Sequence, residues 1–203
     1  EGITGISVKD IEYGKKFGYV LKLLAIGKNG DNGIEVRVHP SFIKNSHPLA
    51  SVNDSYNAVY ITGDCVEDVM LYGRGAGALP TGSAIVGDII YCATHTNYQY
   101  STFKNTEDAA PTTKFIENFE SAYYIRLNAT DRPGVLAKIT SIFAKCRISV
   151  AQMSQEREPE NEDTVPLIFI THITHENNVN KAVKLINEGE DVAKVAAVIR
   201  VVS

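Results

Sequence analysis

The sequence predicts an α+β protein in two parts. The first part is a strand-rich region with helices and a mixed or antiparallel sheet, and the second is a smaller region of βαββαβ order. Two observations support this. In the last third, strand-like runs alternate with stretches at helical spacing. Residues 96–121 are rich in Ser, Thr, Asn and Pro without a period, so we interpret them as a linker between domains at 1–95 and 122–203.

The first domain opens with a short segment and a brief helix. We expect Ile3–Ser7 to form a short strand. In VKDIEYGKKFG, Val8, Ile11 and Phe17 lie at roughly helical spacing, and Gly18 is a C-terminal stop signal.

A hairpin follows this helix. YVLKLLAIG and GIEVRVHP read as strands joined by the turn cluster KNGDNG. In the second strand Glu35 and Arg37 alternate with Ile34, Val36 and Val38, which predicts that the charged side faces solvent. SYNAVYITGD and EDVMLYG predict two more strands.

The domain ends with a predicted helix, LPTGSAIVGDIIYCA. Pro80 suits its first turn. Ile85, Ile89 and Ile90 share one side, which we expect to face a core.

The last domain reads as strand, helix, strand, strand, helix, strand. Its strands are YYIRLNA, ISVAQMSQE, TVPLIFITHIT and VAAVIRVV, and its helices are PGVLAKITSIFAKC and HENNVNKAVKLINEG, the second ending at Gly189. We expect these apolar residues to point inward from the two helices: Val135, Leu136, Ile139, Ile142, Phe143, Val179, Ala182, Val183 and Ile186. This order predicts a ferredoxin-like fold, a four-stranded antiparallel sheet with two helices on one face.

Composition narrows the function classes. The chain has a net charge of −4 and scattered Lys and Arg, which argues against nucleic-acid binding. Its longest apolar stretches, such as VLKLLAI, are too short to span a bilayer, and no secretory leader is visible. Cys65, Cys92 and Cys146 read as buried thiols in a reducing compartment, so we expect a cytoplasmic protein. Because Glu1 is not Met, we expect the sequence to start inside a longer protein.

The most informative motif is DRPGVLAKITS at Asp131–Ser141. Asp131 suits the cap of the following helix, Pro133 its first turn, and Gly134 a close backbone approach. Exposed N–H groups at a helix start, with the positive end of the helix dipole, favour an anion such as an amino-acid carboxylate. The alternative is a well-capped turn without a ligand.

A second motif, GRGAG at Gly73–Gly77, follows a strand and leads into a helix. Its glycines would let backbone approach a phosphate or nicotinamide closely. Its spacing is not GxGxxG, so the alternative is a turn that permits tight helix–strand packing. No histidine or cysteine set has metal-ligand spacing, and no nucleophile–base or carboxylate pair is recognisable, so we assign no metal site and no catalytic residue.

The segment YYIRLNATDRPGVLAKITSIFAKCRISVAQMSQ resembles the ACT domain, a regulatory module that binds small ligands, usually amino acids, between paired copies. The resemblance implies a ligand site in the strand–helix loop, completed by the second strand across the interface. The loop residues would be Asp131, Arg132, Pro133, Gly134, Val135 and Leu136, and the second-strand residues Ile148, Gln152 and Ser154.

GYVLKLLAIG, RVHPSFI, HPLASV and GRGAGALPTGSAIVGDII together resemble the C-terminal half of the catalytic region of homoserine dehydrogenase. That family interconverts L-homoserine and L-aspartate 4-semialdehyde with NAD(P), in threonine and methionine biosynthesis, and threonine commonly inhibits it. The resemblance implies a homo-oligomer, a dimer or tetramer, with L-threonine or another amino acid as effector. It also implies cofactor contacts from Gly75, Gly77 and Thr81.

The chain departs from that family in what it lacks. It has no counterpart of the N-terminal Rossmann domain, and none of the D-x-x-G-x-D-x-x-x-K stretch with the catalytic lysine. We therefore expect this chain alone to bind no cofactor, to be inactive, and to expose apolar surface. The alternative is a free-standing amino-acid-binding regulatory module without an enzymatic role.

Overall fold

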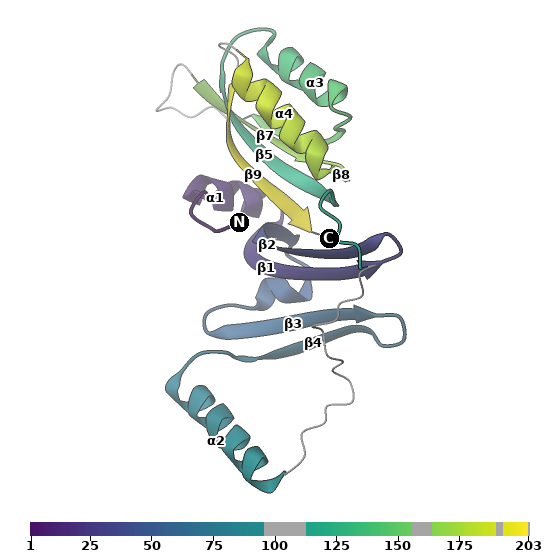
Figure 1. The fold of residues 1–203 in the computed structure, drawn as a ribbon. Coiled ribbons are helices and arrows are strands. Elements are labelled where there is room, and N and C mark those ends of the chain that lie inside the picture. Colours follow the sequence, from purple (N-terminus) through teal and green to yellow (C-terminus); the bar gives the residue numbers. More distant parts are fainter. Residues whose placement is uncertain (96–112, 156–163, 190–192, 203) are drawn as a thin grey trace. The chain divides into compact units, whose positions relative to one another are not determined.

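The computed structural model describes residues 1–95, 113–155, 164–189 and 193–202 (Figure 1). The chain forms two compact units. The first combines Glu1–Asn45 with Lys114–Ser203, and the second is Ser46–Thr113. The opening residues of the expected first domain therefore pack with the last third of the chain.

One sheet organises the first unit. Its strands lie in the order β1-β2-β9-β5-β7-β6, and a short strand, β8, pairs with β5 beside this path. The last third supplies these elements in chain order: β5 (Glu120–Thr130), α3 (Val135–Lys145), β6 (Val150–Gln155), β7 (Thr164–Thr171), β8 (Thr174–His175), α4 (Glu176–Glu188) and β9 (Ala193–Val202). Strands β9, β5, β7 and β6 pair antiparallel, and α3 and α4 lie together on one face (Figure 1). The α+β class and the βαββαβ order are confirmed.

The predicted hairpin extends this sheet. β1 (Tyr19–Gly30) and β2 (Gly33–Lys44) pair antiparallel along their whole lengths, which confirms the hairpin. β2 also pairs in parallel with β9, beginning at Ser41 opposite Arg200. Sequence reasoning missed this pairing, because a partner strand far along the chain leaves no local pattern.

Alternate side chains of the sheet enter two cores. The core beneath α3 and α4 contains Tyr123, Ile125, Leu127, Ile139, Phe143, Val179, Ala182 and Ile186, among others. The core on the opposite face contains Tyr13, Phe42, Tyr124, Ile168, Ile170, Ala197, Ile199 and Val201. Each large apolar side chain buried in this way stabilises the fold by about 1.5–3 kcal/mol. The predicted inward residues of both helices are buried or partly buried in the first of these cores.

Helix α1 (Val8–Lys16) covers the face opposite α3 and α4. Ser7 and Asp10 form a capping box at its start, and Gly18 (φ +79°) follows its end. The strand predicted at Ile3–Ser7 is wrong: these residues form a turn in which Ile6 N donates to Ile3 O at 3.0 Å. Ser7 is needed as the helix cap and so cannot continue a strand.

The side of β2 predicted to face solvent is also wrong. Arg37 is only 9% exposed, whereas Val36 on the other side is 66% exposed. The Arg37 guanidinium lies 4.2 Å from the centroid of the Phe119 ring and forms an ion pair with Glu35 at 2.5 Å. Phe119 comes from the distant segment before β5, so the alternation alone could not show which side it covers.

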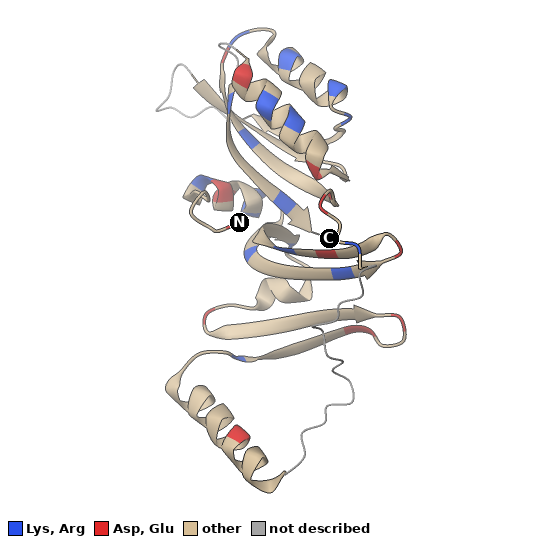
Figure 2. Ribbon diagram, viewed as in Figure 1, with Lys and Arg blue, Asp and Glu red and all other residues tan. Residues whose placement is uncertain are grey.

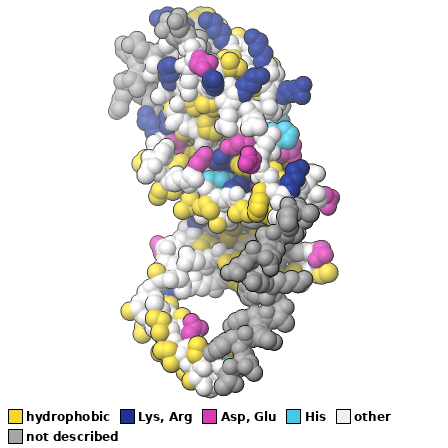
Figure 3. All heavy atoms as spheres, in the orientation of Figure 1, with side chains coloured by type: hydrophobic (Ala, Val, Ile, Leu, Met, Phe, Trp, Pro, Cys, Tyr) yellow, Lys and Arg dark blue, Asp and Glu magenta, His cyan; other side chains and the backbone are white. Residues whose placement is uncertain are grey.

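The second unit contains η1 (Pro48–Ser51), the hairpin of β3 (Tyr56–Gly63) and β4 (Glu67–Arg74), and helix α2 (Ala78–Thr94). The hairpin and the helix are confirmed. The expectation that Ile85, Ile89 and Ile90 face a core is wrong for the described residues, because each is more than half exposed and α2 has no buried residue. Asp88 is the only charged residue of α2 (Figure 2). Its hydrophobic side chains lie on the surface (Figure 3).

Three smaller expectations need correction. Gly134 (φ +90°), not Asp131, is the N-cap of α3, and no side-chain hydrogen bond caps this helix. Pro133 therefore precedes the helix instead of lying in its first turn.

Of the three thiols expected to be buried, Cys65 and Cys92 are exposed, and Cys146 alone is buried.

The expected linker lies partly outside the described residues, at 96–112. Its last part pairs with the start of β2. Ile34 N donates to Lys114 O at 2.8 Å, and Ile116 N donates to Ile34 O at 2.9 Å. Gly33 (φ +131°) permits this approach, because a Cβ there would lie 2.4 Å from Lys114 O. The segment from Lys114 onward therefore belongs to the first unit.

Candidate functional site

The loop between β5 and α3 forms a pocket of about 300 Å³. All six predicted loop residues line it, together with four that sequence reasoning did not name: Asp131, Arg132, Pro133, Gly134, Val135, Leu136, and also Thr130, Gln155, Val165 and Leu167. Arg132 N donates to Thr130 O at 2.9 Å, which turns the chain out of the strand and toward the helix. A contiguous loop thus meets the ends of β6 and β7.

The pocket combines an anion-binding end with apolar walls. Val135 N donates to Arg132 O at 3.3 Å, the N–H groups that follow it in the first turn of α3 have no side-chain cap, and the helix dipole places partial positive charge there. No heavy atom lies within 4 Å of a Cβ built on Gly134, so the backbone is open to a ligand. Val165 and Leu167 provide an apolar wall, while Asp131 and Gln155 can accept hydrogen bonds from an ammonium group. This chemistry matches a small α-amino acid.

None of the three predicted second-strand residues, which the resemblance assigns to a site between paired copies, lines this pocket. Ile148 is buried in the core beneath α3 and α4. Gln152 and Ser154 pair with Ile170 and Ile168, whose side chains enter the opposite core. Directly paired residues point to the same face of a sheet, so Gln152 and Ser154 point away from the loop of their own chain.

Gln155 is the β6 residue that lines the pocket. It pairs with Leu167, which belongs to the core beneath the helices and also lines the pocket. Which side chain of β6 faces the pocket follows only from the pairing register of this strand, because a shift of one residue exchanges the two faces of a strand.

The predicted cofactor residues lie between β4 and α2. Gly75 N donates to Ser55 O at 3.0 Å, and a Cβ on Gly75 would lie 1.5 Å from the amide nitrogen of Asn57. Gly77 (φ +122°) is the N-cap of α2, and Thr81 N donates to Gly77 O at 3.1 Å. Local packing and backbone conformation therefore account for both glycines, and the loop is exposed.

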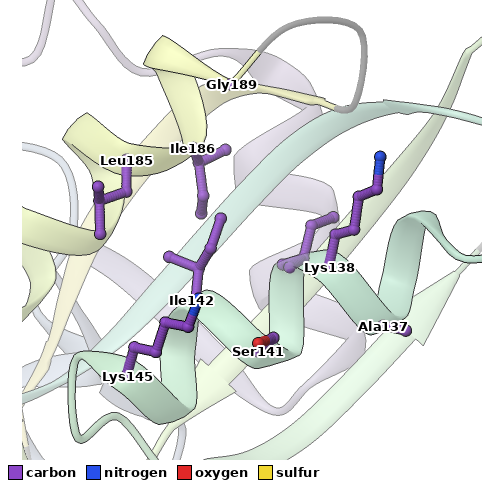
Figure 4. Close-up of a pocket in the computed structure, with 9 residues that line it drawn as sticks. Ala137, Lys138, Ser141, Ile142, Lys145, Leu185, Ile186 and Gly189 are labelled. Carbon is purple, nitrogen blue, oxygen red and sulfur yellow. The ribbon is translucent and has the colours of Figure 1, made fainter.

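A larger cavity of about 520 Å³ lies between α3 and α4 (Figure 4). Ile142, Leu185 and Ile186 form its apolar walls, and Lys138 and Lys145 lie along its α3 side. None of the predicted site residues lines this cavity.

The described residues offer no other obvious chemical centre. Among them, no group of three or more His, Cys, Asp or Glu side chains could hold a metal ion. His39 is buried, with Nδ1 2.9 Å from Ser41 Oγ. Burial, and then the charge of Arg200, lower the pKa of His39, so the ring is neutral at pH 7. Within the described part of the chain, no helix is both long and apolar enough to cross a membrane.

Two family models match successive parts of the chain. Residues 1–90 match the family model described as homoserine dehydrogenase, and residues 123–188 match the model described as ACT domain. The chain is 37% identical over 210 residues to homoserine dehydrogenase of Corynebacterium glutamicum, covering 98% of the chain and 45% of the relative. It is 35% identical to the Neisseria gonorrhoeae enzyme, covering 100% of the chain and 48% of the relative.

A solved structure of a homoserine dehydrogenase from Thiobacillus denitrificans has the same fold. It superposes with a TM-score of 0.84 at 39% identity, covering 100% of this chain and 47% of that one. The chain spans about half the length of the curated relatives it matches.

Proposed function

We propose that this chain, whose residues 1–90 belong to the homoserine dehydrogenase family and whose residues 123–188 form an ACT domain, is the regulatory C-terminal part of an NAD(P)-dependent homoserine dehydrogenase. The whole protein would interconvert L-homoserine and L-aspartate 4-semialdehyde in the biosynthesis of threonine and methionine. Its compartment would be the cytoplasm, which suits the free thiols of Cys65, Cys92 and Cys146.

The cofactor contribution of this chain would be small. Gly77 and Thr81 lie at the exposed start of α2, whereas a Cβ on Gly75 would meet the Asn57 side chain. NAD(P), when bound to the whole protein, would accept or supply the hydride. The sequence contains neither GxGxxG nor the lysine-bearing stretch, so we expect this chain alone to show no hydride transfer.

The effector would be L-threonine, bound in the pocket between β5 and α3. The observation that supports this site is that all six predicted loop residues line one pocket. The carboxylate would meet the N–H groups that follow Val135 in the first turn of α3, the ammonium group would meet Asp131 and Gln155, and the side chain would lie against Val165.

Pairing of two copies would complete the regulatory unit. β6 is an edge strand of the sheet, so its outer backbone groups are available to a second copy. Gln152 and Ser154 lie on this edge strand, from which they could reach a ligand held by the partner. The protein would therefore act as a homo-oligomer, a dimer or tetramer.

Thermal unfolding tests the effector site. L-threonine at a hundred times its dissociation constant should stabilise the chain by about 2.7 kcal/mol, whereas homoserine, methionine and NADPH serve as comparisons. Gln155→Ala should abolish the threonine shift. Gln152→Ala is the second variant, because it removes the same side chain from the other face of β6 and so tests for a contact across paired copies.

The outcomes separate the parts of the proposal. A shift lost in both variants would mean that Gln152 contacts the ligand of a paired copy, whereas a shift lost in Gln155→Ala alone would confine the site to the pocket of one copy. A shift retained in Gln155→Ala would contradict the assigned pocket, and the absence of any amino-acid shift in the parent chain would contradict the effector function.

A further inference from the structure

A buried ion pair joins α1 to the central strand β5. Asp10 is fully buried, and its Oδ1 accepts hydrogen bonds from Arg126 Nε at 2.7 Å and from Tyr124 OH at 3.0 Å. Its Oδ2 accepts hydrogen bonds from Arg126 Nη2 and from Ser7 N, both at 3.1 Å. We call these four residues, Ser7, Asp10, Tyr124 and Arg126, the α1 bridge.

The α1 bridge connects the two family regions directly. Ser7 and Asp10 lie in the region that belongs to homoserine dehydrogenase, and Tyr124 and Arg126 lie in the ACT domain. All four lie in one compact unit. The contact therefore provides a route between the regions that does not pass along residues 96–112.

The bridge tolerates little displacement. Burial alone would raise the pKa of Asp10, but hydrogen bonds from Arg126 and Ser7 outweigh burial and lower this pKa, so the carboxylate is ionised at neutral pH. Arg126 reaches both carboxylate oxygens, and such bidentate pairing depends strictly on geometry. Separating a buried pair leaves charges without compensation.

Strand β5 links the bridge to the effector pocket. It ends at Thr130, which lines the pocket, and four residues of extended strand, about 13 Å, separate Thr130 from Arg126. The pairing register of β5 with β9 shifts between Arg126, opposite Ala197, and Leu127, opposite Val195, so the extra residue, Ala196, belongs to β9. This bulge disrupts the ladder between β9 and β5 locally. It lies between the bridge and the pocket.

We propose that the α1 bridge transmits effector binding from the pocket to the catalytic region. Occupancy of the pocket changes the course of β5 beyond the bulge, and Arg126 and Tyr124 pass this change to Asp10 and α1. The inference rests on the proposed function, because an effector shifts the enzyme only if it binds two arrangements unequally. Tyr124 and Arg126 are positioning residues in this scheme.

Two neighbouring tyrosines of β5 supply the test. Tyr123 and Tyr124 are both buried, and each hydroxyl donates to a carboxylate: Tyr124 to Asp10 in α1, and Tyr123 to Glu176 within the last third. In the whole enzyme, Tyr124→Phe should raise the threonine concentration for half-inhibition about fivefold or more. Its kcat and KM without threonine should not change, and calorimetry should still detect threonine binding.

Arg126→Lys is the second variant. It retains the positive charge but loses the bidentate geometry, so it should weaken inhibition in the same direction. Tyr123→Phe should leave the inhibition curve of the parent enzyme unchanged.

Three results would overturn the inference. Unchanged inhibition in both Tyr124→Phe and Arg126→Lys would exclude the bridge as the route. Equal loss of inhibition in Tyr123→Phe would mean that the coupling is not specific to the α1 bridge, because Glu176 also pairs with Arg200, which pairs with Glu1. A parent enzyme that threonine and other amino acids fail to inhibit would contradict the proposed regulation itself, and the bridge with it.

Discussion

Along β2, polar side chains lie inside the protein and valines lie outside. His39 is nearly parallel to the Phe119 ring, at an interplanar angle of 13° and a centroid distance of 6.4 Å, and Arg37 stacks on the same ring. Alternation of polar and apolar residues shows that the two sides of a strand differ, but not which side is buried. The buried side of β2 is the one that packs against the Phe119 ring, which comes from a distant segment of the chain.

Stability should depend on pH through His39. The pKa of His39 is lowered by burial and then by Arg200, so the unfolded chain binds this proton more readily than the folded chain. The folded chain therefore keeps its full free energy of unfolding above the unfolded pKa of about 6.5. This free energy falls as the pH drops below that value, because the unfolded chain takes up the proton first. Urea unfolding at pH 8.0, 6.5 and 5.5 should show a falling midpoint, and His39→Gln should reduce this fall.

His175→Gln is the control for this prediction, because His175 is exposed and contacts the exposed Glu120. If the pH dependence in His39→Gln matched that of the parent chain, burial of His39 would not be its source.

At the scale of elements, α1 reaches the sheet through a glycine. Gly14 is buried, and a Cβ there would lie 2.3 Å from Cε1 of Phe42. The Phe42 ring also contacts Tyr124 in an edge-to-face arrangement at 5.1 Å. The close approach of α1 to β2 and β5, on which the α1 bridge depends, therefore needs a residue without a side chain.

Gly14→Ala tests this packing. Helix propensity alone would favour Ala by about 1 kcal/mol. Overpacking against Phe42 should cost about 1–3 kcal/mol, so the variant should be less stable in urea unfolding. Gly27→Ala in β1 is the control, because no heavy atom lies within 4 Å of its Cβ. A more stable Gly14→Ala would show that α1 can move away from Phe42 without cost.

At the scale of the whole molecule, α2 is the helix whose apolar side chains are left exposed by the residues that the structure describes. None of its residues is buried in the described structure, and Leu79, Ile85, Val86, Ile89 and Ile90 are all exposed. Contiguous apolar surface of this kind marks a site of interaction. In the proposed enzyme it would meet the part of the protein that the relatives have in addition.

The chain alone should therefore associate through α2. Sedimentation velocity should show association that increases with concentration, and the double variant Ile85→Glu with Ile89→Glu should reduce it. Ile173→Glu, at an exposed position of the first unit, is the control. If the double variant associated as strongly as the parent chain, the copies would associate through another surface, such as the edge of β6.

The local elements could be predicted from the sequence because their signals are local. The βαββαβ order, both hairpins and α1 follow from apolar periodicity and from turn residues such as those of KNGDNG. The six loop residues at Asp131–Leu136 line one pocket because they are contiguous, so a motif was enough to group them.

Contacts between distant segments were decided by the tertiary structure. The parallel pairing of β2 with β9, the ring of Phe119 over Arg37 and the bridge from Asp10 to Arg126 all join residues far apart in sequence. The placement of Gln155 at the pocket and of Gln152 on the opposite face of β6 depends on the strand register, which is set by the neighbouring strand. The sequence by itself therefore determined most of the elements and where the loop that lines the pocket lies, through short-range periodicity and turn chemistry. Which faces are buried, and how the loop is connected to α1, was decided by long-range packing, because burial depends on what another segment places against a surface.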